Sequence, residues 1–171
     1  MRLPSLLASA ALVLLTGAAA EIIGLPAVAP AVAAPERAIL TIAEDTGART
    51  LATFDRARLE ELGTRIVRTT TPWTDGVGAF EGVLMRDVLA SAGVQGRSVK
   101  VSALNDYSYT IPAKDLTDYP VILAFKINGR DFTSRDKGPF WVIYPRDDYP
   151  ELKTKEIEHR MVWQVNKILV P

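Results

Sequence analysis

Two short segments of alternating apolar and polar residues, 99–103 and 107–111, lie on either side of the pair Asn105-Asp106. Alternation with a period of two places every second side chain on the same face of a β-strand. Asn and Asp are residues that readily form turns. A chain that reverses direction after such short runs is expected to build antiparallel β-sheet.

Further short β-rich runs end at turn residues along the chain. The pair Asn128-Gly129 predicts another tight hairpin, because both residues accept the positive φ angles that such turns need. The other expected strands are 38–42, 51–54, 65–69, 80–83, 121–127, 140–144 and 161–170, of which 80–83 also reads as a turn. Residues 76–78 are expected to form a loop.

Two short helices are expected, one between an N-cap at Asp55 and a stop at Gly63, the other over 84–92. Residues 112–119 read as a single helical turn. Together the elements predict an α+β fold that is mainly β, with short helices and a largely antiparallel, barrel-like or sandwiched core. A length of 171 residues suits one compact domain.

The N-terminus has the composition of a secretory signal peptide. Arg2 precedes an apolar run over 6–15 and a small-residue stretch that ends at Ala20. We expect residues 1–20 to be the signal peptide, with cleavage after Ala20 or as late as Ala34. Residues 21–35 would then form a flexible lead, and 36–171 the domain. Retention of the apolar run as a membrane anchor is the alternative.

Charge and cysteine content exclude several classes of function. The chain has 20 basic and 20 acidic residues, mixed along its length, and therefore lacks the basic stripe that nucleic-acid binding needs. It has no cysteine, so it forms no disulfide and offers no thiolate to a metal. The single histidine, His159, cannot build a first-row metal site and is expected at the surface. No Ser-His-Asp set emerges, because any such triad would have to use His159.

Three ordered segments resemble one known family. "FEGVLMRDVLASAGV" (80–94), "DYSYTIPAKDLTDYPVILAFKINGRDF" (106–132) and "DKGPFWVIYP" (136–145) with "MVWQVNKILV" (161–170) are similar to the molybdopterin domain of the sulfite-oxidase family. The resemblance covers nearly all of 36–171. It implies the fold of that domain, and a pocket for molybdenum on a pterin dithiolene with one cysteine thiolate as the protein ligand.

Some residues of the family pattern are present and others are replaced. Tyr107 matches the active-site tyrosine, and Trp163 matches the tryptophan of the closing strand. Residues 67–73 occupy the place of the cysteine loop, with threonine where the ligand should be. Trp141 stands in the place of the substrate arginine and Val162 in that of a lysine. A threonine hydroxyl is a poor ligand for a soft metal centre, and an indole lacks the bidentate fork that holds sulfite.

The resemblance, with these replacements, predicts a protein that binds a metal-free pterin without turnover. Short exported members of the family resemble periplasmic pterin-binding proteins, whose partners are inner-membrane signalling proteins that control cyclic di-GMP. A periplasmic location and such a partner are therefore expected. Two alternatives stay open: a molybdopterin-dependent oxidoreductase with atypical metal ligation, and an interaction domain whose pocket is filled by Trp73 and Trp141.

Six residues are candidates for ligand binding, and most have a second interpretation. The candidates are Trp73, Asp106, Tyr107, Arg135, Lys137 and Trp141. The tryptophans are expected either to stack on the ligand or to belong to the core, and Trp163 is expected in the core. Asp106 reads as a turn former or as a partner of the pterin edge. Arg135 and Lys137 read as contacts to an anionic tail or as a solvated hairpin.

Overall fold

The computed structural model describes residues 39–171. Its strands are β1 (Leu40–Glu44), β2 (Thr50–Phe54), β3 (Thr64–Thr70), β4 (Val77–Leu84), β5 (Ser98–Ala103), β6 (Ser108–Pro112), β7 (Ile122–Ile127), β8 (Arg130–Asp131), β9 (Phe140–Ile143) and β10 (Trp163–Val170). Its helices are α1 (Arg56–Glu60), α2 (Met85–Ser91), α3 (Ala113–Asp118), the 3₁₀ helix η1 (Pro150–Leu152) and α4 (Lys155–Arg160). The expected signal peptide and lead lie outside the described residues.

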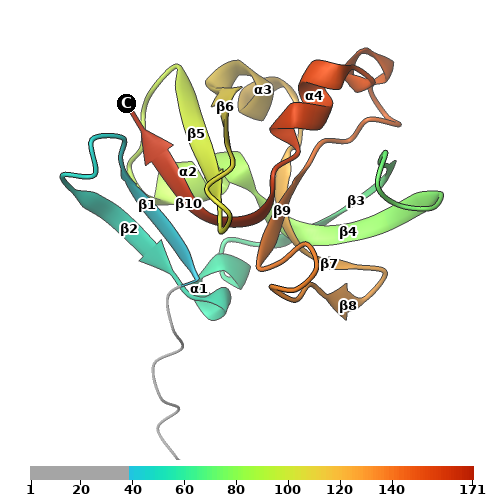
Figure 1. Ribbon diagram of the computed structural model, residues 1–171, viewed down its shortest axis with the longest axis horizontal. Helices are drawn as coiled ribbons and strands as arrows, with labels where there is room; N and C mark the ends of the chain where they lie inside the picture. Colours follow the sequence, from blue (N-terminus) through green and yellow to red (C-terminus); the bar gives the residue numbers. More distant parts are fainter. Residues whose placement is uncertain (1–38) are drawn as a thin grey trace, which may run out of the picture. The chain divides into compact units, whose positions relative to one another are not determined.

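All ten of these strands belong to one connected sheet (Figure 1). The main order is β2-β1-β10-β9-β7-β4-β3, with β5 paired to β10 and β6, and β8 paired to β7. Every pair is antiparallel except β1 with β10. The predicted α+β class, mainly β and largely antiparallel, is confirmed.

The strand β10 joins the two parts of the sheet by bending, as its curved ribbon in Figure 1 shows. Trp163 pairs with Trp141 of β9, whereas Val165 faces both Phe140 of β9 and Ala103 of β5. The register shifts between Trp163 and Val165, where Gln164 has a φ of 54°. One residue in a left-handed conformation thus bends the strand, next to the tryptophan that faces the pocket described below.

Local signals in the sequence fix several element ends as expected. The Asp55 carboxylate accepts a hydrogen bond from the Arg58 backbone N–H at 2.8 Å and so caps α1. Asn128 and Gly129 have φ angles of 51° and 77°, which close the hairpin between β7 and β8. Asp106 has a φ of 65° in the turn between β5 and β6.

One expectation about the elements was wrong, and one helix was missed. Residues 77 and 78 belong to β4, not to a loop, because β4 extends over 77–84 and pairs with β3 over 77–83. The helix α4 was not expected. Its signal was the N-cap Thr154, whose hydroxyl accepts a hydrogen bond from the Ile157 N–H.

Large apolar side chains fill the interior of the curled sheet. Trp141, Tyr144, Phe80, Phe125 and Phe140 are the largest that are fully buried. The helix α4 packs against β6, and α2 packs against β4 and α3. Within residues 39–171, no helix has the length and apolar character to cross a bilayer.

Candidate functional site

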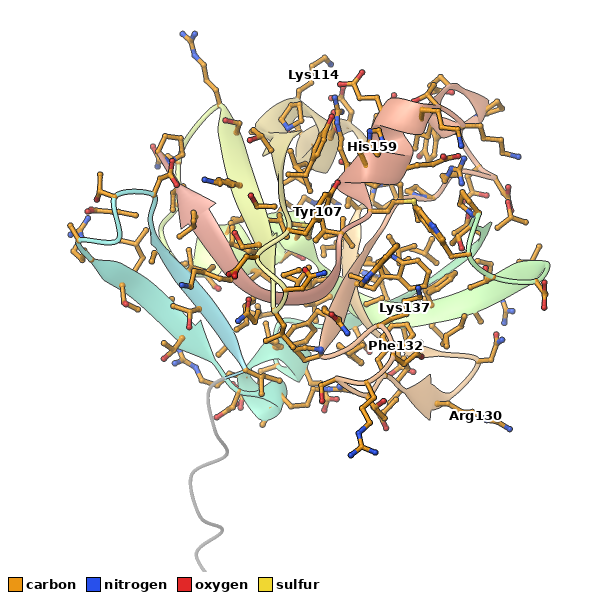
Figure 2. The ribbon with its side chains drawn as sticks, in the orientation of Figure 1. Tyr107, Lys114, Arg130, Phe132, Lys137 and His159 are labelled. Carbon is orange, nitrogen blue, oxygen red and sulfur yellow. The ribbon has the colours of Figure 1, made fainter. Side chains whose placement is uncertain are left out.

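A pocket of about 290 Å³ opens between the β3–β4 loop, the β5–β6 turn and the segment from α4 into β10. Its lining consists of Trp73, Ala103, Asn105, Tyr107, Glu158, His159, Met161, Val162 and Trp163. Figure 2 shows His159 on α4 and Tyr107 beside this helix. Ligand pockets commonly measure ~300–1,000 Å³, so this one has room for a small, flat molecule.

The apolar wall of the pocket is a pair of indoles. The rings of Trp73 and Trp163 meet edge to face, with centroids 5.2 Å apart and an interplanar angle of 78°. The β3–β4 loop holds Trp73 in place, because its backbone N–H donates to the hydroxyl of buried Thr71, which also pairs with the Thr74 hydroxyl at 2.9 Å. Such a fixed pair presents an aromatic face and edge to a ligand.

Behind this pair lies Trp141, which is fully buried. Its ring centroid is 6.0 Å from that of Trp73 and 6.3 Å from that of Trp163. Its indole N–H donates to the Met161 carbonyl at 2.9 Å, and Phe80 packs against it edge to face. Trp141 therefore supports the indole pair from the core and does not line the pocket.

A cation covers the far side of Trp163. The Lys137 ammonium lies 4.0 Å from the centre of the Trp163 ring, a distance typical of a cation–π contact. Gln164 fixes the loop that carries the lysine: its side-chain amide donates to the Ser134 and Asp136 carbonyls, and its backbone N–H donates to the Lys137 carbonyl. The same bent residue of β10 therefore positions both the indole and the lysine.

The opposite wall carries hydrogen-bonding groups. The Tyr107 phenol donates to the His159 carbonyl at 3.3 Å, and the Asn105 side chain accepts from the Tyr107 backbone N–H. Burial, and to a lesser degree the neighbouring Tyr109, raises the pKa of Tyr107, so the phenol stays a neutral donor at neutral pH. The amide N–H₂ of Asn105 and the His159 ring stay available to a ligand at this wall.

Glu158 brings a carboxylate to the pocket. It is bound by Arg146, which is nearly fully buried, at 3.1 Å, and by Lys155 at 2.7 Å. The hydrogen bond from Lys155 and the charge of Arg146 lower the pKa of Glu158. The carboxylate is thus charged at neutral pH, and each of its oxygens keeps a lone pair for one more donor.

A second ion pair fastens α4 to the rest of the domain. Asp115 of α3 accepts hydrogen bonds from the Arg160 guanidinium at 2.5 Å and from the Tyr144 phenol at 2.8 Å. Burial, with the Asp115 carboxylate beside it, raises the pKa of Tyr144. Because α4 is tied down at Arg160 and at Glu158, the polar wall is fixed before any ligand arrives.

The structure brings together some of the six candidate residues. Trp73 and Tyr107 line the pocket, and Lys137 and Trp141 contact its indole wall from outside. Asp106 sits exposed at the tip of the β5–β6 turn, and Arg135 lies exposed in the β8–β9 loop. Neither belongs to the pocket lining. Contact of all six with a ligand stays a prediction.

Other residues of the site were not singled out by sequence reasoning, or were placed elsewhere. Trp163 is only partly buried and lines the pocket, so the expectation that it belongs to the core was wrong. Arg146, in the loop after Pro145, was not singled out, and it is buried against Glu158. His159 is exposed as expected, and it also lines the pocket.

Comparisons with known proteins identify the protein family of the chain. Residues 50–147 match the family described as oxidoreductase molybdopterin binding domain, and the chain belongs to this family. The structure also resembles the crystal structure of the sulfane dehydrogenase SoxCD from Paracoccus pantotrophus, with a TM-score of 0.51 and 17% sequence identity. The match covers 75% of this chain and 36% of that one, so this chain spans about a third of that chain's length. No curated protein matches.

The residues of the pocket fit the pterin ring of a molybdopterin better than its molybdenum. The indole pair and the apolar wall suit the face of a pterin ring, and Glu158 and Asn105 suit its polar edge. The chain has no thiolate, and residues 39–171 contain no group of three or more His, Cys, Asp or Glu side chains placed to hold a metal ion. The donor set therefore does not fit a thiolate-held molybdenum.

Proposed function

We propose that this protein binds a metal-free pterin, or a closely similar heterocycle, in the Trp73–Trp163 pocket and acts by binding and not by turnover. The observation that carries the proposal is the pairing of a fixed aromatic wall with a charged carboxylate in a small pocket, within a chain of the molybdopterin-binding family that has no cysteine.

Each wall has a distinct role in this proposal. The indoles contact the face of the ring. Glu158 accepts hydrogen bonds from the amino-pyrimidinone edge, which presents two adjacent donors and so matches a carboxylate. Lys137 lies against Trp163 outside the pocket lining, so its positive charge would meet only an anionic substituent that extends past this indole.

The proposed location is the periplasm, and the proposed partner is the periplasmic part of a membrane-bound signalling protein. Its support is the signal-peptide composition of residues 1–20 and the resemblance to short exported pterin-binding proteins. Signalling requires only that the loaded form binds the partner better than the empty form. A tenfold difference in affinity corresponds to about 1.4 kcal/mol.

The test is to purify the full chain from the periplasm of a host that makes both pterins and the molybdenum cofactor. Mass spectrometry of the small molecules released on denaturation should find a pterin at about one per chain, and elemental analysis should find no molybdenum. Molybdenum at one per chain would overturn the proposal in favour of an oxidoreductase with atypical ligation. If neither a pterin nor molybdenum is found, the result favours an interaction domain without ligand.

A further inference from the structure

The strand β3 ends the sheet. Among residues 39–171 it pairs with β4 alone, and its other edge faces away from the sheet. Asp147 closes one end of this outer edge: its carboxylate accepts from the Thr70 backbone N–H at 2.7 Å and from the Thr70 hydroxyl at 2.8 Å. Within residues 39–171, the remaining edge, from Thr64 to Arg68, has no such cover.

The direction of the backbone groups on this edge follows from two hydrogen bonds. The Thr70 N–H reaches Asp147 and therefore points away from β4. Because backbone groups in a strand repeat their direction at every second residue, the N–H and C=O groups of Arg68 and Ile66 point the same way. The second bond agrees. Ala79, the register partner of Arg68, directs its N–H and C=O to Asn128 and hence away from β3. Ile66 and Arg68 thus direct N–H and C=O groups to the outside, and these groups have no partner in the part of the chain that the structure describes.

A groove of about 620 Å³ runs beside these groups. Its lining consists of Arg65, Ile66, Val67, Arg68, Leu84, Arg86, Pro120, Pro145 and Asp148. The two prolines and Leu84 give it apolar parts, and Ile66 has 61% of its surface exposed. An open strand edge with a groove alongside is the geometry of β-strand addition, in which main-chain bonds supply affinity and side-chain pockets supply specificity.

The charge of the groove selects the kind of strand. Within the described residues, Arg65 and Arg68 form no ion pair, and Arg86 approaches only Asp87, at 4.0 Å. Asp148 is the one acid of the lining. Charged residues on a strand edge normally prevent pairing with a copy of the same strand, because like charges then lie opposite each other. The same arginines attract a strand that carries carboxylates.

We propose that β3 is a docking edge for an extended, acidic segment of a partner protein. The segment pairs with the N–H and C=O groups of Ile66 and Arg68, and its carboxylates meet Arg65, Arg68 and Arg86. The site is separate from the pterin pocket, since none of its residues lines that pocket. An experiment can therefore contradict the docking edge without contradicting the pterin proposal, and the reverse.

The experiment uses the full chain and a synthetic peptide, Thr-Glu-Glu-Val-Glu-Glu-Thr, with two matched peptides. Its glutamates project to both faces of an extended strand, as Arg65 and Arg68 do on β3. One replaces each Glu by Lys. The other keeps Glu but has an N-methyl group on every residue, so neither of its edges can donate to a strand. The acidic peptide should bind at least about tenfold more tightly than either control. It should also slow hydrogen exchange of the Ile66 and Arg68 amides.

Charge reversal separates a docking edge from a general attraction. The double variant Arg65→Glu, Arg68→Glu should lose the acidic peptide and gain the lysine peptide. The control Arg130→Glu should change neither, because Arg130 lies on β8, on the other side of β7, and projects away from the sheet in Figure 2.

Three results would overturn the proposal. The first is equal affinity for the acidic and lysine peptides, or no binding of either. The second is binding that perturbs Trp73 and Tyr107 in place of Ile66 and Arg68. The third is self-association of the chain in sedimentation experiments that protects the same two amides, which would assign the edge to a second copy.

Discussion

The indole rings of Trp73 and Trp163 contact each other edge to face at 5.2 Å, although ninety residues separate them in the chain and they belong to different elements. Trp163 is placed by the bend of β10, and Trp73 by a loop that two threonine hydroxyls hold in shape. The pair therefore exists only in the folded domain. Each indole makes a different contribution, which substitutions can separate.

Substitution Trp73→Ala should weaken pterin binding about tenfold without unfolding the domain. Trp73 is 37% exposed and is not part of the buried core cluster, whereas an aromatic contact contributes about 0.5–1.5 kcal/mol beyond the area it buries. Fluorescence titration with a pterin measures the effect. Leu104→Ala is the matched control, because Leu104 is exposed next to the pocket but does not line it. Equal affinity of wild type and Trp73→Ala would contradict the assignment of the pocket.

Substitution Trp141→Phe should instead lower the stability of the fold, by about 2 kcal/mol or more. It removes volume from a fully buried site and leaves the Met161 carbonyl without its donor. Urea unfolding followed by circular dichroism gives the free energy of unfolding. Trp163→Phe is the control, with an expected cost below about 1 kcal/mol, because Trp163 is only partly buried. Similar losses in both variants would show that Trp141 has no special place in the core.

Most of the fold could be predicted from the sequence because its signals are local. Alternation, the Asn128-Gly129 turn and the Asp55 cap each act within a few residues, and each was recovered. The parallel pairing of β1 with β10 was not predictable, since it joins the two ends of the domain and depends on the whole sheet. The helix α4 is too short to show a clear apolar period.

The site was predictable only in part, for a physical reason. Trp73 attracted attention because exposed aromatic side chains often serve binding, and Tyr107 because it matches the active-site tyrosine of the family that the sequence resembles. The structure places both in the pocket lining. Glu158 and Arg146 were not recognised as site residues, because charged residues are ordinarily solvated. Their pairing depends on how α4 folds back over the loop after β9, a contact that no local pattern encodes.

Gln164 offers a test of the bend in β10. Both Gln164→Ala and Gln164→Gly remove the hydrogen bonds to the Ser134 and Asp136 carbonyls, and both should speed hydrogen exchange in residues 134–137. Only glycine accepts a φ of 54° without steric cost. That relief of about 1–2 kcal/mol exceeds the entropy of about 0.4–1 kcal/mol that glycine adds to the unfolded state. The glycine variant should therefore be the more stable in urea. The opposite order would show that Gln164 is unstrained.

Asp147 connects the loop after β9 to the end of β3, and its charge makes that connection sensitive to pH. A hydrogen bond from Lys153, with two more from Thr70, lowers the pKa of Asp147 below its value in the unfolded chain, about 3.9. Its contribution to stability is therefore present above that value and lost as the pH falls through the folded-state pKa. Asp147→Asn, which removes the charge at every pH, should lower the free energy of unfolding at pH 7 by about 1–2 kcal/mol.

The difference between wild type and Asp147→Asn should then shrink as the pH falls below 4, because the wild-type carboxyl takes up its proton there. Urea midpoints of both proteins, measured at intervals between pH 7 and pH 2.5, give this difference in stability directly. Asp148→Asn is the matched control: its carboxylate is exposed, and within the described residues it forms no hydrogen bond or ion pair, so its effect should stay within about 0.5 kcal/mol at every pH. A difference between Asp147→Asn and wild type that stays constant down to pH 2.5 would show that the Asp147 charge does not hold β3 in place.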